Sequence, residues 1–322
     1  MHEALFYRKL DLQNVECQLC PHNCIIAPNN SGICRARKNI EGKLYAINYG
    51  KTISISIDPI EKKPLFHFFP NSQILSLGAN SCNFHCDFCQ NYSISQFPAP
   101  TKNITPEIII NLCQKYNLNS VAFTYTEPFT WFEFIYDSAK KLKSNNIKVV
   151  LVTNGFINPK PLKMLLPYID AMNIDLKSFD EDFYKKYCGG NLENVLQTIE
   201  IAATDCHIEI TNMIIPGLND STELIEKLAK FISEINKNIP LHLSRYFPSY
   251  KMQIPATDEQ TILDLSEIAS KYLNYVYLGN MIYPNNTFCP KCGKLLIERF
   301  SYKNYILDGK CQNCGYKIYG EF

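Results

Sequence analysis

The sequence predicts an α/β fold: a partial (β/α) barrel carrying a small cysteine-rich module at each end. Three observations lead to it. The centre of the chain alternates short β-branched runs with longer amphipathic segments, which is typical of parallel βα units. Both ends lack this alternation and are rich in cysteine. The length of 322 residues allows two or three domains, because a domain usually holds about 100 to 200 residues.

The strands are expected where β-branched and aromatic residues cluster between turn signals. The runs are ILSLGA (74–79), VAFTY (121–125), VVLVTN (149–154), AMNIDLK (171–177), HIEITNMII (207–215), PLHLSRY (240–246) and YVYLGN (275–280). Seven strands at this spacing indicate a barrel or partial barrel.

Helices are expected in the segments between these runs, where capping residues and amphipathic patterns occur. Pro106 and Glu107 open one helix, and the run DSTE (220–223) offers caps for another. The predicted helices cover 106–117, 129–144, 159–167, 191–204, 221–236 and 257–272. The alternation of these segments with the strands is what parallel pairing requires.

Three domains are expected: a four-cysteine module over 1–45, the partial barrel over 46–285, and a paired-CxxC metal module over 286–322. Segments of about 40 residues rarely fold on apolar burial alone. Each flanking module therefore needs a metal, a disulfide or a partner to fold.

The overall charge excludes some classes of partner. Lys and Arg number 32 and Asp and Glu 31, which gives a net charge of +1. This balance gives no general electrostatic attraction to nucleic acid or to an anionic membrane. No run approaches the roughly 20 apolar residues of a membrane span. The amino-terminal residues also lack a signal-peptide layout, so we expect a cytoplasmic protein.

Cysteine placement is the strongest signal in the sequence. All but three of the 14 cysteines fall into three tight groups. In a reducing compartment such groups indicate metal or cluster ligands rather than disulfides. The groups are Cys17, Cys20, Cys24 and Cys34; Cys82, Cys86 and Cys89; and Cys289, Cys292, Cys311 and Cys314. The remaining three, Cys113, Cys188 and Cys206, are expected to be buried apolar residues. The alternative for Cys188, in FYKKYCGGN near the barrel mouth, is a thiyl or hydrogen-atom donor.

The middle group forms a CxxxCxxC loop directly after the first barrel strand. Its three thiolates, Cys82, Cys86 and Cys89, are one short of a closed four-ligand site. If they hold three irons of a 4Fe-4S cubane, the fourth iron can chelate the amino and carboxylate groups of S-adenosylmethionine. The cofactor would then supply a 5′-deoxyadenosyl radical that abstracts hydrogen from a substrate. The alternative is a zinc site completed by His85 or by a more distant residue.

Polar residues at other strand ends point to the same pocket, because active sites of parallel barrels lie at the carboxyl ends of strands. These stretches are TYTEP (124–128), TNG (153–155), DLK (175–177), IPGLND (215–220) and SRYFP (244–248). His207 and Glu209 share a strand face. They would serve either as an acid/base pair or as a satisfied polar group in the barrel interior.

In this order, the loop and the strand-end stretches resemble radical enzymes related to the pyruvate formate-lyase activating enzymes. The resemblance implies S-adenosylmethionine contacts at Phe88, which precedes the third cysteine, and at Glu127, Asn154, Asp175 and Lys177. The family's second-strand motif is usually Gly-Gly-Glu-Pro, whereas this chain has Tyr125 and Thr126 in place of both glycines. Arg245 is a further candidate for binding a carboxylate. The alternative for Asp175 and Lys177 is an ordinary ion pair.

The two flanking groups have four cysteines each, so each can close a metal site. At the amino end CxxCxxxC with Cys34 fits zinc or a 4Fe-4S cluster equally, as a structural or an electron-transfer centre. The nearby His22 is expected to lie outside the ligand set. At the carboxyl end two CxxCG knuckles favour a zinc ribbon over a rubredoxin-like iron site. That site would be a structural staple or a one-electron relay.

Taken as a whole, the chain resembles the radical S-adenosylmethionine enzymes of the AmmeMemoRadiSam system. The resemblance covers about residues 15–322 and includes CxxCPHxC, DPIEKKPLFHFFP, CNFHCDFCQN, NIDLK and the terminal CxxCG pair. It implies a radical S-adenosylmethionine type of barrel, a 4Fe-4S cluster and S-adenosylmethionine. It also implies companion proteins of the AmmeCR and Memo types and an electron donor of the flavodoxin or ferredoxin type. It implies no particular substrate.

Three functions are therefore weighed. The first is a radical enzyme that abstracts hydrogen from an unidentified small molecule or protein. The second is an activating enzyme that installs a glycyl radical in a partner. The third is a non-catalytic module that binds several metals for assembly or electron storage.

Overall fold

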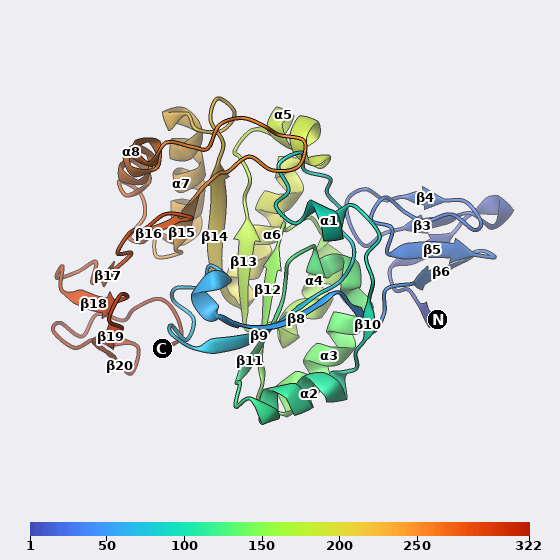
Figure 1. Cartoon of the computed structure of the whole chain (residues 1–322), viewed down its shortest axis with the longest axis horizontal. Helices are drawn as coiled ribbons and strands as arrows, with labels where there is room; N and C mark the ends of the chain where they lie inside the picture. Colours follow the sequence, from blue (N-terminus) through green and yellow to red (C-terminus); the bar gives the residue numbers. More distant parts are fainter.

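The computed structural model describes residues 1–322 and has an open eight-stranded sheet at its centre (Figure 1). The strand order is β16-β15-β14-β13-β12-β11-β9-β8. All neighbours pair in parallel except β8, which pairs with β9 antiparallel. The two edge strands, β8 and β16, do not pair with each other, so the barrel is partial. The predicted fold class is confirmed.

Every predicted barrel strand is present, with small shifts at its ends. The predicted strands are β9 (Gln73–Gly78), β11 (Ser120–Phe123), β12 (Lys148–Thr153), β13 (Ala171–Asp175), β14 (His207–Ile214), β15 (Leu241–Arg245) and β16 (Val276–Gly279). The sheet also contains β8 (Ser54–Pro59). The sequence reasoning missed β8. Its two isoleucines, Ile55 and Ile57, are exposed, so its apolar alternation faces away from the core and gives no burial signal.

The longer connecting helices also lie where they were predicted, and two short ones, α1 and α5, are additional. The helices are α1 (Tyr92–Ser95), α2 (Pro106–Lys115), α3 (Phe132–Ser144), α4 (Pro159–Leu165), α5 (Glu181–Phe183), α6 (Leu192–Asp205), α7 (Thr222–Asn236) and α8 (Glu259–Ala269). Side chains cap several of them, because a hydroxyl or carboxylate satisfies the first free amide groups. Ser221, for example, accepts from the amide of Leu224 at the start of α7. The predicted helix 129–144 is divided into a 3₁₀ turn, η3 (Pro128–Trp131), and α3.

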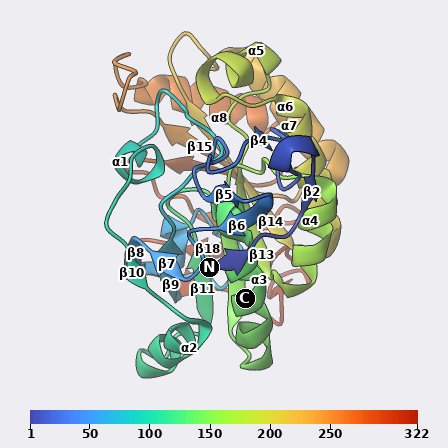
Figure 2. The same cartoon turned by 90° about the vertical axis from the view of Figure 1, so that its right-hand side faces the viewer.

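The amino-terminal residues form two small antiparallel sheets that project from the barrel (Figures 1 and 2). One has the order β1-β6-β5 and the other β2-β3-β4. Their strands are β1 (His2–Glu3), β2 (Tyr7–Lys9), β3 (Val15–Cys17), β4 (Ile25–Ile26), β5 (Arg37–Ile40) and β6 (Lys43–Ala46). These sheets share the main apolar core of the barrel. A short pair, β7 (Lys51–Thr52) and β10 (Lys102–Asn103), follows.

The carboxyl-terminal residues form a second small unit with a separate apolar cluster, built around Tyr275, Tyr277 and Leu296. Its strands are β17 (Thr287–Phe288), β18 (Leu295–Glu298), β19 (Lys303–Asn304), β20 (Ile306–Leu307) and β21 (Lys310–Cys311). No helix of the chain combines the length and the apolar character needed to cross a membrane.

Candidate functional site

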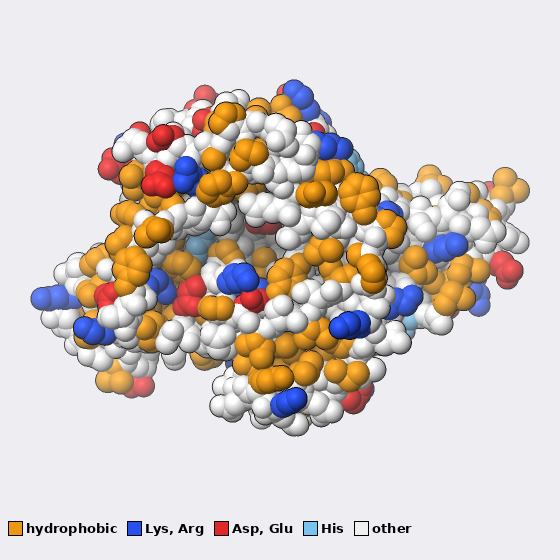
Figure 3. All heavy atoms as spheres, in the orientation of Figure 1, with side chains coloured by type: hydrophobic (Ala, Val, Ile, Leu, Met, Phe, Trp, Pro, Cys, Tyr) orange, Lys and Arg blue, Asp and Glu red, His pale blue; other side chains and the backbone are white.

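The three-cysteine loop follows β9 at the carboxyl edge of the sheet. Strands β11, β12 and β13 end at the same edge, so Glu127, Asn154 and Asp175 lie at the ends of neighbouring strands. The side-chain nitrogen Nδ2 of Asn154 is 3.9 Å from the Cys82 sulfur. The face of the molecule drawn in Figure 3 is hollowed near its centre, over the region of β13 and β14. The ends of these neighbouring strands therefore lie side by side at one edge of the sheet.

The loop is held by the segment that follows α5. The amide of His85 donates to the carbonyl of Cys188 at 3.0 Å, and the amide of Asp87 donates to Tyr187 at 3.0 Å. Two glycines make this approach possible. A Cβ atom on Gly189 would lie 2.2 Å from the His85 ring, and one on Gly190 would lie 2.2 Å from the Phe84 ring. Only residues without a side chain fit between these groups.

The three thiols have different surroundings. Burial raises the pKa of Cys82 well above its usual value, and the carboxylate of Glu127 adds to this effect. The pKa of Cys86 is lowered instead, first by a side-chain hydrogen bond with Cys188 and then by the charge of Lys177, against the effect of burial. The Cys89 sulfur lies 3.3 Å from the Ser95 hydroxyl. The fully buried Cys188 is thus a fourth thiol beside the loop.

The loop does not have the geometry of a site for a single metal ion. Only the carboxyl-terminal group brings three or more His, Cys, Asp or Glu ligand atoms within 4.8 Å of one another. The zinc alternative needs four ligands tightly gathered around the ion, and neither His85 nor any other residue completes such a set here. Three separated thiols from one loop fit a polynuclear cluster with an open iron.

Glu127 is buried completely and connects the end of β11 with the end of β12. Its carboxylate accepts hydrogen bonds from the amide of Phe129 (2.9 Å), the hydroxyl of Thr153 (2.6 Å) and the amide of Asn154 (2.8 Å). Burial raises the pKa of Glu127 to about 7, although these hydrogen bonds oppose the shift. A carboxylate has about four acceptor positions, so roughly one is left for a further donor.

Asn154 connects this carboxylate to the cysteine loop. Its side-chain nitrogen donates to the Asn83 side-chain oxygen at 2.9 Å, next to Cys82 in the chain, and its oxygen accepts from the amide of Phe156 at 2.9 Å. The side chain is therefore fixed at both ends. It holds the first cysteine in place relative to β12.

Tyr125 occupies one of the two positions where the related enzymes have glycine. Its φ of 73° lies in the left-handed region, which side-chain-bearing residues rarely adopt. Its hydroxyl donates to Asp58 at 2.7 Å, and the Lys63 ammonium lies 4.6 Å from its ring centre. Tyr125 thus adopts the left-handed backbone conformation that suits glycine, and the contacts of its side chain stabilise this conformation.

Asp175 and Lys177 form an ion pair of 3.1 Å at the end of β13. Burial disfavours the charge on Lys177, but Asp175 and the thiols of Cys86 and Cys188 outweigh it and raise its pKa well above the usual value. Lys177 is therefore both paired with Asp175 and close to the thiols of the cysteine loop. The backbone amide of Lys177 donates to the Tyr184 hydroxyl at 2.9 Å.

The other two predicted cofactor residues are engaged within the protein. Arg245 donates to the carbonyl of Thr257 at 2.6 Å and to the carboxylate of Glu259 at 2.7 Å. Its guanidinium thus pairs with a carboxylate of this chain. Phe88 is buried, with its ring 5.7 Å from that of Phe183.

A buried polar network lies at the amino end of the sheet, and the part of it formed by His242 and by the amides of Phe66 and His67 was not predicted. Glu209 is buried completely. Its carboxylate accepts from His242 at 2.6 Å and His207 at 3.1 Å, and from the amides of Phe66 and His67 at 2.8 and 2.7 Å. This matches the second interpretation of His207 and Glu209, a satisfied polar group in the interior. The hydrogen bonds from Phe66 and His67 thereby connect the segment DPIEKKPLFHFFP to Glu209 on β14.

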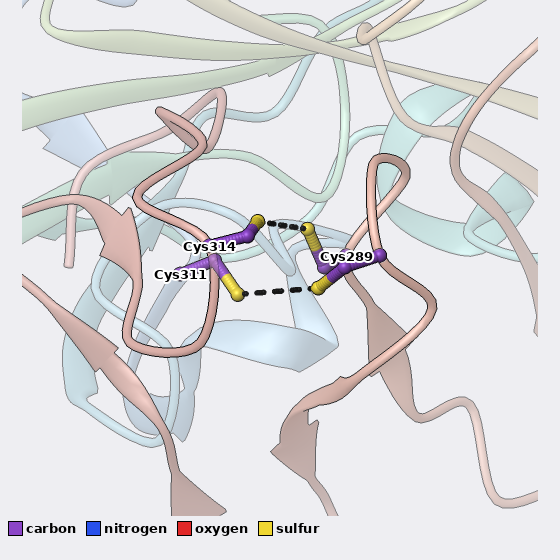
Figure 4. A group of neighbouring side chains, drawn as sticks. Cys289, Cys311 and Cys314 are labelled. Carbon is purple, nitrogen blue, oxygen red and sulfur yellow. Dashed lines mark hydrogen bonds between the residues drawn. The ribbon is translucent and has the colours of Figure 1, made fainter.

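The carboxyl-terminal cysteines form a compact four-sulfur site (Figure 4). The sulfurs of Cys289 and Cys314 are 3.6 Å apart, and those of Cys292 and Cys311 are 3.8 Å apart. Zinc–thiolate bonds of about 2.3 Å in a tetrahedron separate the sulfurs by about 3.8 Å. A backbone hydrogen bond lowers the pKa of Cys292 to about 6. This group could therefore bind one metal ion.

Comparison with known proteins identifies the family. The Radical SAM superfamily profile matches residues 77–232, which include the three-cysteine loop and the strand ends described above. A protein of unassigned function from Methanocaldococcus jannaschii is 44% identical over 99% of both chains. The chain belongs to the radical SAM superfamily. The superfamily implies a 4Fe-4S cluster and S-adenosylmethionine, and its members are enzymes.

Among more distant relatives of this radical SAM protein are activating enzymes. A pyruvate formate-lyase-activating enzyme of Staphylococcus epidermidis is 22% identical over 50% of this chain and 69% of its own length. A 4-hydroxyphenylacetate decarboxylase activating enzyme of Clostridium scatologenes is 30% identical over 37% of this chain and 38% of its own. The crystal structure of Streptococcus suis SuiB bound to S-adenosylmethionine covers 65% of this chain and 51% of that one, with a TM-score of 0.50 and 17% identity. That likeness supports the fold.

Proposed function

We propose that Cys82, Cys86 and Cys89 bind a 4Fe-4S cluster, and that this chain uses it with S-adenosylmethionine to abstract hydrogen from a substrate. When bound, the cluster and S-adenosylmethionine supply a 5′-deoxyadenosyl radical. The observation that carries the proposal is the open set of three thiols at the carboxyl edge of a parallel sheet. A fourth thiol, Cys188, lies beside Cys86; we assign it to packing of the loop.

The residues around the loop have distinct parts in this proposal. Lys177 and Asp175 line the approach to Cys86, where a cation and a carboxylate can bind the carboxylate and the ribose of S-adenosylmethionine. Asn154 and the remaining acceptor position of Glu127 suit its amino group. Phe88 supports the third cysteine from within the core. Arg245 can bind a substrate carboxylate only if it exchanges Glu259 for it, since the two are paired at 2.7 Å.

We further propose that the chain belongs to the AmmeMemoRadiSam system and acts with companion proteins of the AmmeCR and Memo types. The DPIEKKPLFHFFP segment supports this assignment, because it has a defined role in this fold: its amides bind Glu209. An electron donor of the flavodoxin or ferredoxin type would reduce the cluster. The grouping of 11 of the 14 cysteines as candidate metal ligands rather than disulfides suits a reducing compartment such as the cytoplasm.

A glycyl-radical activating function is the second candidate. The names of the relatives favour it, since two of those described above are activating enzymes. Such an enzyme binds a protein partner at the mouth of the barrel. The hollowed face of Figure 3 is the surface where a partner would dock.

We propose the division into an amino-terminal module (1–45), a barrel (46–285) and a carboxyl-terminal module (286–322), with one zinc ion in the last. The 3.6 and 3.8 Å sulfur separations support one ion of either zinc or iron. The chemistry of paired CxxCG knuckles favours zinc.

The test is formation of 5′-deoxyadenosine by the anaerobically reconstituted, reduced protein with S-adenosylmethionine, measured by mass spectrometry. We expect product from the wild type and none from Cys86→Ala. Cys113→Ala is the matched control, because Cys113 is a buried cysteine of α2 outside every group. The proposal fails if Cys86→Ala forms as much product as the wild type. It also fails if wild-type protein with iron at the loop forms none, alone or with either companion protein.

A further inference from the structure

The amino-terminal cysteines surround one small buried cavity. Cys17 ends β3, Cys20 and Cys24 follow in the next turn, and Cys34 precedes β5. All four line one buried cavity together with apolar side chains that include Leu19, Ile26 and Phe129. The lining of this cavity is mostly thiol and hydrocarbon. The cavity therefore suits a ligand that binds sulfur.

The spacing of the sulfurs distinguishes this site from the carboxyl-terminal one. In the carboxyl-terminal group all four sulfurs lie within 4.8 Å of one another, whereas the amino-terminal cysteines do not form such a compact group. One zinc ion would gather its thiolates to about 3.8 Å, since each bond is about 2.3 Å long, and would leave no cavity between them. A 4Fe-4S cubane holds its thiolates farther apart because each binds a different iron.

A buried cation faces this cavity. Arg37 also lines it and is 1% exposed. Its terminal nitrogens donate to the carbonyl of Leu5 and to the carboxylate of Glu133, but its Nε has no hydrogen-bond partner. A buried donor without a partner is rare. A cluster sulfide or a cysteine thiolate in the cavity would be the missing acceptor, and its negative charge would be balanced by the guanidinium.

The same cavity reaches the three-cysteine loop. Asn83 lines it and is the residue next to Cys82. His22, from the turn that carries Cys20 and Cys24, donates from Nε2 to the Asn83 carbonyl at 2.8 Å. The Asn83 side chain in turn accepts from Asn154. The two cysteine groups are therefore separated by a single hydrogen-bonded layer of protein.

We propose that Cys17, Cys20, Cys24 and Cys34 bind a second 4Fe-4S cluster, fully ligated by protein, which exchanges single electrons with the cluster at Cys82, Cys86 and Cys89. One electron enters from a flavodoxin-type or ferredoxin-type reductant and one leaves to the neighbouring cluster, so no bond forms or breaks. The presence of the second cluster is independent of the function proposed above. Its role as a relay rests on that function.

The first test measures iron and acid-labile sulfide in the Cys82→Ala/Cys86→Ala/Cys89→Ala variant of the full chain. The amino-terminal module is unchanged in it, so the test does not depend on how that module tolerates mutation. We expect about four sulfides per chain in this variant and about eight in the wild type. Sulfide is the decisive quantity, because a rubredoxin-like iron at the carboxyl end would contribute none. A variant with zinc and no sulfide overturns the proposal.

The second test uses electron paramagnetic resonance of the dithionite-reduced proteins. The triple variant should retain one 4Fe-4S signal, which an added Cys20→Ala/Cys24→Ala change removes. The wild type should show two signals broadened by spin coupling, since a single layer of protein separates the sites. Two unbroadened signals would overturn the relay. Two clusters without 5′-deoxyadenosine formation would refute the proposed reaction and leave the second cluster established.

Discussion

Replacing Gly190 by alanine tests how closely the three-cysteine loop is packed. The new Cβ would lie 2.2 and 2.8 Å from two atoms of the Phe84 ring. Phe84 is 2% exposed and its ring is packed 4.9 Å from that of Phe156, so it has little room to move. Phe84 lies between Cys82 and Cys86 in the chain, and any displacement of its backbone moves both ligands.

The expected cost is that of an overpacked core, about 1 to 3 kcal/mol, together with loss of the cluster. We expect Gly190→Ala to lower the melting temperature by several degrees and to lose about four irons per chain after anaerobic reconstitution. Formation of 5′-deoxyadenosine should fall with the iron. Iron and sulfide assays and a thermal unfolding curve on the same sample measure these effects.

Gly309→Ala is the matched control. Gly309 has a φ of 69°, and no neighbouring atom lies within 4 Å of the place that an added Cβ would take. Alanine there costs about 1 to 2 kcal/mol of backbone strain without touching the loop. It should lower stability and keep its iron. If Gly190→Ala retains wild-type iron and product formation, the loop adapts easily, and the argument from close packing is wrong.

Three further changes test other parts of the structure. Tyr125→Phe removes the hydroxyl that donates to Asp58 and should lower the free energy of unfolding by about 1 to 2 kcal/mol; urea unfolding measures it, and an unchanged midpoint would contradict the contact. The pKa of the Glu209 carboxyl is held well below its usual range by the hydrogen bonds from His207 and His242, in spite of burial. Its stabilising effect is therefore complete above the unfolded pKa of about 4.3 and is lost as the pH falls through the lower folded value. Glu209→Gln should destabilise the protein most at pH 7 and progressively less below pH of about 4, and a pH-independent difference would refute this. Cys311→Ser should abolish the single metal ion of the carboxyl-terminal module, measured by elemental analysis, while cluster iron at Cys82, Cys86 and Cys89 is retained; loss of both would show that the sites are not independent.

The sequence alone determined the order of the barrel elements and the grouping of the cysteines. Both are local properties. A β-branched run and an amphipathic run differ in period, and ligands a few residues apart are brought together by one turn. The seven parallel strands, the helices between them and the open set of three thiols were therefore predicted from the order of residues, without any knowledge of long-range contacts.

The tertiary structure alone decided which distant groups meet. Strand β8 gave no signal because its isoleucines face outward, and its antiparallel pairing with β9 depends on a partner strand. The left-handed backbone at Tyr125 is held by Asp58, a residue far away in the sequence. Likewise, Arg245 was expected to bind the carboxylate of a ligand, but the fold places Glu259 beside it, and the two side chains form an ion pair.

The clearest example is the contrast between the two four-cysteine groups. Both have short spacings that close a metal site, and spacing alone left zinc and a cluster equally possible at the amino end. The separation of the sulfurs depends on how two loops are held by the packing around them. Only the folded chain gives close sulfurs at Cys289, Cys292, Cys311 and Cys314 and a cavity between the amino-terminal four. The sequence determines which ligand residues are present, whereas the tertiary contacts of the segments that carry these residues determine the distance between them.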